Sequence, residues 1–578
     1  MTIDNQSISL VIGIDFGTSR SGYAYAFTDD TRIYGKIDWS GAPAPYPKTQ
    51  SHLLYSPNRE VIAWGFDARK KLAELQKDAD KHNFFQNFKM QLREGKQKNA
   101  NGPVITTNNG KEFAVIDLIA DYLRLLKDLA LKEIKEATKG YLRNEQIRWC
   151  LTIPAIWTDA EKQLMRSAAQ QAELIGSSET EAERLLLVLE PEAAALYLQE
   201  RKNLQLDPGT RFMVVDCGGG TIDITVHEVI SGKGLQEVAE GTGAAYGSTY
   251  VDKNFQEYLE KKLTAEVIER FHDEEPINYL EMMAEWERIK CDFDPEKGNS
   301  IIYFPLPPKL YKILSKDYSK ILENLAAEQD GDDNTIRLSH EIMKGIFDPL
   351  LQGLVAKVEE EFAKLGSQGC DYIYLVGGFS KSPLLRQQIQ KRFGARVKQI
   401  FMPTEPGEAI VQGSVSFGLN PETIRTRRSR LTYGCGVSLP FDVDKDPESK
   451  RLIVPDYKEA MCNNRFKVFV VAGDSVGVNQ AVVHNITPLH HKTTSMHLQF
   501  YATKKREVRY TDEPEVEKLG ELTVEMPDTT GGINREVEVT MYFGKTEIKV
   551  EAKDKTSGKK CDTTLRFSST YSPEILGV

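Results

Sequence analysis

Residues 211–229 read RFMVVDCGGGTIDITVHEV, with a glycine-rich turn between two apolar runs. Each run has the length and the β-branched content of a buried strand, so the segment predicts a hairpin. Three consecutive glycines cost conformational entropy on folding, and a turn that only reverses the chain would rarely need all of them. We therefore interpret Gly218, Gly219 and Gly220 as a loop whose backbone amides surround a phosphate group.

The same pattern occurs near the N-terminus. Residues 9–27 combine an apolar strand that ends in Asp15, the turn FGTSRSG and a second apolar strand. A turn free of large side chains brings the amides of Gly17, Thr18 and Ser19 close to phosphate oxygens, and Asp15 can hold water bound to Mg²⁺. Taken alone, this motif leaves a bare hairpin turn as the alternative.

Two copies of one unit of strand, turn and strand predict a duplicated fold with two facing lobes. Helical patterns over 114–139 and 158–174 alternate with strand patterns over 147–153 and 184–189. Such alternation favours α/β layers.

A third glycine motif follows a buried strand in YIYLVGGFSKSPLLRQQIQKRF, residues 372–393. Gly377 and Gly378 stand between the strand and a predicted helix. Glycines at this place let a flat ligand such as adenosine lie against the backbone. The alternative is an ordinary turn from strand to helix.

After about Leu431 the sequence pattern changes to short β-rich segments separated by turn residues, which predicts an antiparallel β-sandwich. The basic stretch before it is interpreted as a solvated linker, with a phosphate-binding patch as the alternative. The predicted organisation is a nucleotide-binding domain over 1–422 (lobe I about 1–207, lobe II about 208–400, a returning helix 405–418), a basic linker over 423–430, the sandwich over 431–569 and a tail over 570–578.

Bulk composition narrows the class of protein. A formal charge of −10 and a pI near 5.6 argue against nucleic-acid binding, which needs a basic surface. The sequence predicts no membrane insertion and no signal peptide. Seven cysteines without a Cys-x-x-Cys spacing argue against a disulfide framework and a zinc site. A reducing, cytoplasmic location is expected.

The three glycine motifs, in this order and spacing, resemble the two phosphate loops and the adenosine loop of the superfamily of actin, sugar kinases and heat-shock ATPases. Further strings resemble the 70-kDa heat-shock chaperones: LTIPAIW with Pro154, LEPEAAALY with Glu190, EWERIKCDF with Glu287 and Lys290, and VEAKDKTSGK in the β-rich part. The resemblance implies an α/β fold with a duplicated actin-like (ribonuclease H-like) ATPase domain of two lobes, followed by an antiparallel β-sandwich.

The resemblance also implies the site. Asp15 and Asp216 would hold waters of the Mg²⁺ shell with help from Glu190, and Thr18 and Thr221 would contact the γ-phosphate of ATP. In NFFQNFKMQL, Lys89 matches the catalytic lysine, and a solvated helix lysine is the alternative. The predicted catalytic residues are Lys89, Glu190, Asp216 and Thr221; the predicted ATP/ADP-binding residues are Asp15, Gly17, Thr18, Ser19, Gly218, Gly219, Gly220, Glu287, Lys290, Gly377, Gly378 and Lys381.

Several positions depart from the family pattern. Arg20 stands where an aromatic residue is usual, and it would add a cation near the phosphates or displace a monovalent ion and slow turnover. Cys291 and Lys381 replace arginines that flank the adenine. NPETIRTRRSR occupies the place of the acidic-hydrophobic linker, and no helical lid is expected after the sandwich. Together these departures resemble the branch of heat-shock 70 kDa protein 12.

The function that follows is an ATP-binding, Mg-dependent, ATP-hydrolysing chaperone-like protein. Its nucleotide state would be coupled to binding of unfolded or extended polypeptide by a lidless sandwich, with co-chaperones as further partners. One alternative is a nucleotide-binding scaffold with little turnover. Another is a small-molecule kinase of the same superfold, although sugar kinases end with their second lobe and lack an added sandwich.

Overall fold

The sheet of the first lobe is built on the N-terminal hairpin, in which β1 (Leu10–Phe16) pairs antiparallel with β2 (Arg20–Phe27). β1 also pairs in parallel with β11 (Ile147–Ile153), and β11 pairs in parallel with β12 (Leu185–Leu189). The computed structural model describes residues 8–564 except 31, 95–97, 100–101, 108–109, 139, 141–142, 201–205, 299–300, 479 and 544–546.

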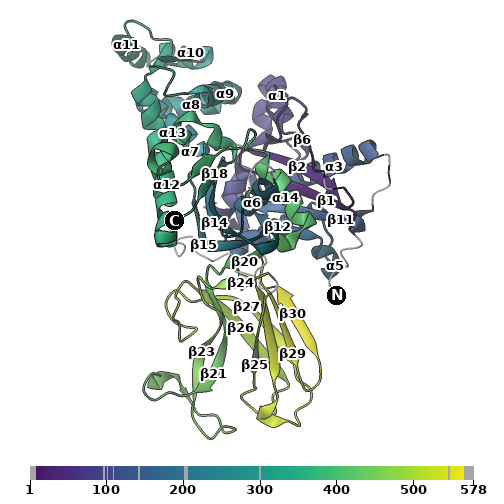
Figure 1. Ribbon diagram of the computed structural model, residues 1–578. Coiled ribbons are helices and arrows are strands. Elements are labelled where there is room, and N and C mark those ends of the chain that lie inside the picture. The colour runs from purple at the N-terminus through teal and green to yellow at the C-terminus, as the bar shows by residue number, and fades with distance from the viewer. Residues whose placement is uncertain are drawn as a thin grey trace.

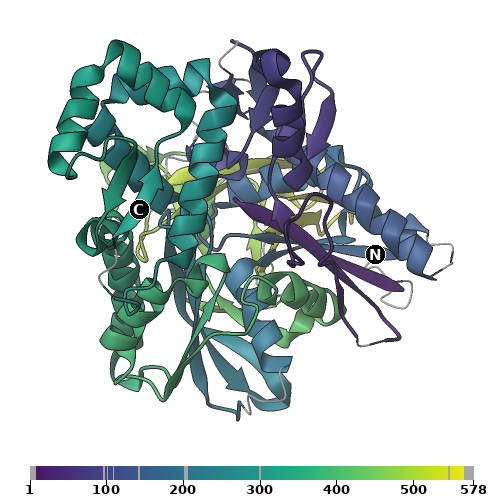
Figure 2. The ribbon, with the colours of Figure 1, turned by 90° about the horizontal axis from the view of Figure 1, so that it is seen from above.

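The sheet of the second lobe repeats this connectivity. β13 (Arg211–Cys217) pairs antiparallel with β14 (Ile222–Ile230) and in parallel with β18 (Tyr372–Val376), which pairs in parallel with β19 (Gln399–Phe401). β14 continues the sheet to β15 (Gly234–Ala244). The predicted duplication is therefore visible in strand order and direction, and the two lobes lie side by side when seen from above (Figure 2).

Two helices lie between the sheets of the two lobes (Figure 1). α6 (Glu190–Glu200) packs on α14 (Ala409–Leu419), the segment predicted as a returning helix. α14 also packs on β1, β2 and β11, and one core cluster joins both helices to β13 and β18. Small residues allow the close approach, since a Cβ on Gly413 would lie only 1.7 Å from the Ala193 carbonyl oxygen.

Other helices cover the outer faces of the two sheets. In the first lobe, α3 (Val115–Thr138) packs against α4 (Asp159–Gln171), which begins with a capping box formed by Thr158 and Glu161. The remaining first-lobe elements are β3 (Tyr34–Gly35), β4 (Thr49–Gln50), β5 (Leu53–Tyr55), β6 (Val61–Trp64), α1 (Phe66–Leu75), β7 (Asn83–Phe85), α2 (Gln91–Glu94), β8 (Lys98–Asn99), β9 (Gly102–Thr106), β10 (Glu112–Ala114) and α5 (Glu179–Ala182).

The second lobe carries most of the remaining helices. Its largest core cluster joins α12 (His340–Leu365) and α7 (Thr249–Leu263) to the sheet, with Trp286 stacked on Phe255 at a centroid distance of 3.7 Å. The other elements are α8 (Ala265–Glu274), α9 (Pro276–Asp292), β16 (Ile302–Pro305), α10 (Pro308–Asp317), α11 (Ser319–Glu328), β17 (Thr335–Leu338) and α13 (Pro383–Phe393).

The residues after Leu431 form two antiparallel sheets, here called the C-terminal β region (431–564). The sheets share one apolar core that includes Phe500 and Met541, both fully buried. One sheet has the order β22-β23-β21-β26-β27 and the other β25-β28-β29-β30. Their bounds are β21 (Thr432–Pro440), β22 (Arg451–Leu452), β23 (Met461–Val470), β25 (Gln480–Ile486), β26 (Ser495–Thr503), β27 (Glu517–Glu525), β28 (Val537–Phe543), β29 (Lys549–Asp554) and β30 (Lys560–Thr564).

The prediction of a solvated basic linker over 423–430 is wrong. β20 (Ile424–Arg428) extends the second-lobe sheet beside β15 and pairs antiparallel with β24 (Ser475–Gly477), a strand from the C-terminal part of the chain. Arg427 is buried and its guanidinium donates to both oxygens of Glu192, at 2.6 and 2.8 Å. Arg427 can be buried in this strand because the Glu192 carboxylate compensates its charge. A guanidinium that is already neutralised argues against a phosphate-binding patch.

The C-terminal β region is docked on the first lobe as well. The Tyr433 hydroxyl donates to Asp159 at 3.1 Å, and Arg166 pairs with Glu547. Both lobe residues belong to α4. The docking therefore rests on α4 on one side and on the β20 and β24 pairing on the other.

A buried carboxyl in α12 makes the stability of the fold depend on pH. Glu361 is fully buried beside Lys364, and burial raises its pKa to about 7 although Lys364 opposes the shift. Because the folded chain binds this proton more tightly than the unfolded chain, the contribution of Glu361 to the free energy of unfolding falls as pH rises from 4.5 to about 7. Glu361→Gln should therefore stabilise the protein above neutral pH by about 2 kcal/mol and change it little near pH ~4.

Urea denaturation at several pH values measures this difference. Glu360→Gln, at the exposed neighbouring position, is the matched control; it removes only a minor like charge beside Glu361 and should give a much smaller gain above neutral pH. A Glu361→Gln curve parallel to the wild-type curve at every pH would contradict the prediction.

Candidate functional site: a cleft between the lobes

Every residue predicted for the site lines one cleft of about 770 Å³ between the two lobes. The cleft draws on the β1-β2 loop, the β13-β14 loop, the turn after β18, and the helices α7 and α9. The structure thus brings together residues that are up to several hundred positions apart in sequence: Asp15, Gly17, Thr18, Ser19, Lys89, Glu190, Asp216, Gly218, Gly219, Gly220, Thr221, Glu287, Lys290, Gly377, Gly378 and Lys381.

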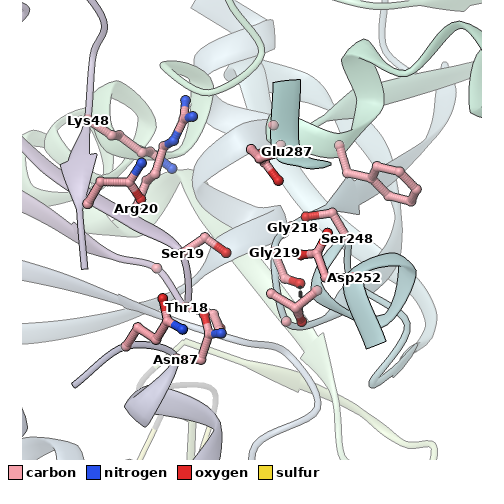
Figure 3. A pocket seen from close by; sticks show the side chains of 18 of the residues that line it. Thr18, Ser19, Arg20, Lys48, Asn87, Gly218, Gly219, Ser248, Asp252 and Glu287 are labelled. Atoms are coloured by element: carbon pink, nitrogen blue, oxygen red, sulfur yellow. Dashed lines mark hydrogen bonds between the residues drawn. The ribbon is translucent and has the colours of Figure 1, made fainter. Parts of the chain in front are cut away.

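The two glycine loops face each other across the cleft (Figure 3). A Cβ on Gly219 would lie 2.2 Å from the Ser19 hydroxyl oxygen, and one on Gly220 would lie 2.5 Å from the Thr18 hydroxyl oxygen. Glycine is therefore required for the approach of the loops. The close approach brings the backbones of both loops to one end of the cleft, which is the arrangement that a phosphate chain bound between two loops needs.

The second loop is fixed by hydrogen bonds from the start of α7. The amides of Ser248 and Thr249 donate to the carbonyls of Gly218 and Gly219, at 3.1 and 2.9 Å, and the Gly247 amide donates to Gly220. These contacts hold the carbonyl edge of the loop on α7. The Gly218 amide donates to the Thr221 carbonyl at 3.0 Å, so within the described part of the chain the amides of Gly219 and Gly220 are the ones left for a ligand such as phosphate.

Two carboxylates end the central strands of the lobes. Asp15 and Asp216 are 1% and 2% exposed, and one oxygen of Asp216 has no hydrogen-bond partner among the described residues. Burial, together with the nearby Glu190 and Asp223, raises the pKa of Asp216 well above its ordinary value. No group of three or more His, Cys, Asp or Glu in the described chain could hold a metal directly. Carboxylates of this kind fit a hydrated divalent cation, held through its waters.

Lys89 lies in the 3-10 helix η3 (Phe88–Met90) and is 2% exposed, so the alternative of a solvated helix lysine is wrong. Its ammonium donates to Glu190 at 2.7 Å and lies 5.3 Å from the Trp157 ring centroid. Burial raises the pKa of Glu190 to about 7, and Lys89 opposes the shift. The pair therefore places one proton-exchanging carboxyl and one ammonium side by side in the cleft.

At the end predicted to hold adenosine, Lys290 pairs with Glu287 and with Asp252, the latter at 2.7 Å. Both carboxylates hold the pKa of Lys290 above its ordinary value, although burial opposes them. Glu287 and Asp252 thus fix the lysine in place and leave carboxylate oxygens exposed to the cleft as acceptors.

Comparison with known proteins places the chain in a family. A sequence model described as Hsp70 protein matches residues 66–303. Heat shock 70 kDa protein 12A of Homo sapiens is 30% identical over 629 residues, covering 98% of this chain and 92% of that protein. The chain belongs to the 70-kDa heat-shock protein family. Its similarity is to the branch of heat shock 70 kDa protein 12.

Two further relatives match this chain, one over nearly its whole length and one over about half of it. Heat shock 70 kDa protein 12B of Homo sapiens is 29% identical over 97% of this chain and 92% of its own length. Chaperone protein DnaK 1 of Synechococcus sp. is 28% identical over 316 residues, which are 54% of this chain and 37% of that protein. Membership of the heat-shock 70 family accounts for the actin-like α/β fold of the lobes. None of the helices in the described parts of the chain has the length and hydrophobicity needed to cross a bilayer.

Three single positions that depart from the heat-shock 70 pattern, Arg20, Cys291 and Lys381, also line the cleft. The Arg20 guanidinium lies 4.8 Å and the Lys381 ammonium 5.6 Å from the ring centroid of Tyr46. Lys381 also pairs with Glu405 at 2.7 Å, and the Cys291 thiol contacts Glu287. Tyr46 therefore lies between one cation from each lobe.

The two glycines after β18 have different roles. Gly377 has φ +79°, and a Cβ there would lie 2.4 Å from both Asp216 and the Cys217 carbonyl, so the fold itself requires this glycine. At Gly378 the nearest atom to a Cβ is the Tyr46 hydroxyl at 3.9 Å. Only Gly378 leaves space for a ligand, whereas the sequence had suggested this for both.

Sequence reasoning missed several cleft residues. Lys48 pairs with Asp15 at 2.5 Å, Asp252 holds Lys290, and Arg69 also lines the cleft. Lys48 stands in an irregular segment, PYPKTQ, that has no periodic pattern. Its position depends on a long-range strand pairing, and no local signal could have shown it.

Proposed function

We propose that this member of the heat-shock 70 family binds ATP and ADP with Mg²⁺ in the interlobe cleft, hydrolyses ATP and acts as a chaperone-like protein. The observation that carries the proposal is the convergence of two facing glycine loops, two buried carboxylates and a buried lysine on one cleft. Phosphoryl transfer to water needs positioning and charge stabilisation, and these groups supply both.

Each group has a distinct part in the proposed reaction. The bound divalent cation would supply charge neutralisation for the phosphates, with its waters held by Asp15 and Asp216. Thr18 and Thr221 would contact the γ-phosphate from opposite loops, and Lys89 would orient the attacking water. Glu190, whose pKa lies near 7, would accept a hydrogen bond or a proton from that water through its place beside Lys89.

The C-terminal β region is proposed to bind unfolded or extended polypeptide, with co-chaperones as further partners. Support comes from the family and from the contacts that join this region to the cleft. α6 begins at Glu190 in the cleft, and two residues later Glu192 holds Arg427 of β20, which pairs with β24. A structural change at Glu190 would therefore be passed to the C-terminal β region through the Glu192–Arg427 pair and the β20-β24 pairing.

A cytoplasmic location is part of the proposal. All seven cysteines are free, and five of them are buried. Unpaired cysteines are typical of a reducing compartment.

Single-turnover hydrolysis of ATP with Mg²⁺ tests the proposed activity. Asp216→Asn should lower the rate by roughly 100-fold, because a buried charge that holds the cation's waters is lost. Extended peptide should change the wild-type rate. Nucleotide binding without measurable hydrolysis in the wild-type protein would contradict the proposed ATPase activity and favour a scaffold. A phosphorylated small molecule as product would indicate a kinase.

The scaffold with little turnover is the second candidate. The observation in its favour is that both buried cleft lysines near the phosphate loops are paired with carboxylates, Lys48 with Asp15 and Lys89 with Glu190. Such pairs stabilise the site as it stands and must rearrange before either lysine contacts phosphate.

A further inference from the structure

Lys48 is a buried cation that touches the phosphate site without belonging to any of the glycine motifs. Its side chain is 10% exposed, and its ammonium lies 2.5 Å from Asp15, whose side chain is 2% exposed. Asp216 of the opposite lobe is also near enough to interact with it electrostatically. Figure 3 shows Lys48 and Arg20 on one side of the cleft, facing Glu287.

The path of the Lys48 side chain depends on a glycine in β2. Asp15 and Gly22 are directly paired across the β1-β2 hairpin. A Cβ on Gly22 would lie 3.2 Å from the Lys48 Cγ and 2.5 Å from the Pro47 carbonyl oxygen. The absence of a side chain at Gly22 therefore lets Lys48 cross β2 and reach the carboxylate on β1.

The segment that carries Lys48 is fixed at several points. The Trp39 indole donates to the Tyr46 carbonyl at 3.0 Å, and the Tyr46 amide donates to Ile37 at the same distance. Immediately after Lys48, Thr49 pairs with Ser21 in the β2-β4 ladder. Backbone contacts on both sides thus hold the lysine in place, while its four-carbon stem can change rotamer.

The charges around Lys48 indicate what it does. A buried carboxylate strongly favours a partner cation, and Asp15 has Lys48 before any metal or nucleotide arrives. Lys89 cannot pair with Asp15 without breaking its own ion pair with Glu190, in which the ammonium lies 2.7 Å from the carboxylate. A nucleotide would bring phosphate oxygens between the glycine loops, within the same cleft that Lys48 lines. The ammonium would then have an anionic partner of higher charge than Asp15.

We propose that Lys48 is a built-in cation of the phosphate site, which pairs with Asp15 in the nucleotide-free protein and shifts onto the phosphate oxygens of a bound nucleoside triphosphate. The inference rests on the proposed nucleotide binding and adds a binding residue to it. Two consequences follow. Nucleotide affinity depends less on Mg²⁺ than it would without the lysine, and a divalent cation binds the nucleotide-free protein weakly because Lys48 competes for Asp15.

Calorimetric titration of ATP, in excess Mg²⁺ and in EDTA, tests the first consequence. Lys48→Gln should weaken ATP binding by roughly tenfold in EDTA and by about threefold or less in Mg²⁺, because in EDTA no divalent cation shares with the lysine the neutralisation of the phosphates. Lys48→Arg keeps the charge and should restore most of the affinity in EDTA. Lys127→Gln is the matched control, since Lys127 is equally buried but binds Ala172 far from the cleft.

Titration of the nucleotide-free protein with Mn²⁺, followed by electron paramagnetic resonance, tests the second consequence. Lys48→Gln should bind Mn²⁺ several-fold more tightly than the wild type, and Lys127→Gln should not. Thermal unfolding of each variant shows that it is folded.

The outcomes separate this inference from the proposed function. If the wild type binds ATP and Lys48→Gln weakens binding equally with and without Mg²⁺, with Mn²⁺ affinity unchanged, Lys48 only fixes Asp15 and the inference is overturned. If the wild type binds no ATP under either condition, the proposed function fails and this inference fails with it.

Discussion

Arg427→Ala is expected to lower the free energy of unfolding by about 3–5 kcal/mol, because it leaves the carboxylate of Glu192 buried without its partner. Glu192 is 2% exposed and accepts both donors of Arg427 within 2.8 Å. The change also loosens β20, through which the second-lobe sheet reaches β24. Urea denaturation of the purified variant measures the loss.

Arg425 supplies the matched control on the same strand. It is exposed, and its guanidinium lies 3.9 Å from the Glu422 carboxylate, so Arg425→Ala should change stability by about 0.5 kcal/mol or less. Removing both partners of the buried pair, as Arg427→Met with Glu192→Met, should recover much of the lost stability because no charge is then left unpaired. An Arg427→Ala protein as stable as Arg425→Ala would contradict the account of β20.

Gly377→Ala is expected to destabilise the protein by about 3 kcal/mol, from an unfavourable positive φ and from overlap of the new Cβ with its neighbours. The overlap is with Asp216 and Cys217, both 2.4 Å away, and φ is +79°. Gly378→Ala adds a methyl group in open space, 3.9 Å from the nearest atom, and should cost less than about 1 kcal/mol. Thermal unfolding of the two variants, measured in parallel, gives the comparison.

The neighbouring glycines serve as controls for each other. Equal loss of stability in the two variants would show that the turn after β18 does not need glycine at position 377 more than at position 378. A stable Gly377→Ala protein would contradict the backbone geometry on which the position of Asp216 in the cleft depends.

Much of the fold follows from local patterns in the sequence. The strand predicted over 147–153 forms as β11 with the same bounds, and the helix predicted over 114–139 forms as α3 (Val115–Thr138). Apolar periodicity decides such elements because one face of each is buried. The glycine motifs were informative for a similar reason: close approach of Gly219 to Ser19 leaves no space for a side chain.

Other features could not be predicted because their causes are long-range. The basic stretch that contains Arg427 appears solvated in sequence, and only the structure shows Glu192, more than two hundred residues earlier, as its partner. Lys48 likewise reaches the cleft through the β2-β4 pairing and through the gap left by Gly22. A charged side chain reveals its role only when the opposite charge beside it is known.

The most direct test of the central claim is a calorimetric titration of ATP, in excess Mg²⁺, onto the wild-type protein and onto Gly378→Val. The account predicts saturable binding of one nucleotide by the wild type, and a loss of affinity of roughly 100-fold in the variant with little change in stability, because the valine would fill the space beside Tyr46. Absence of binding to the wild type, or equal binding to both proteins, would contradict the claim that this cleft is the nucleotide site.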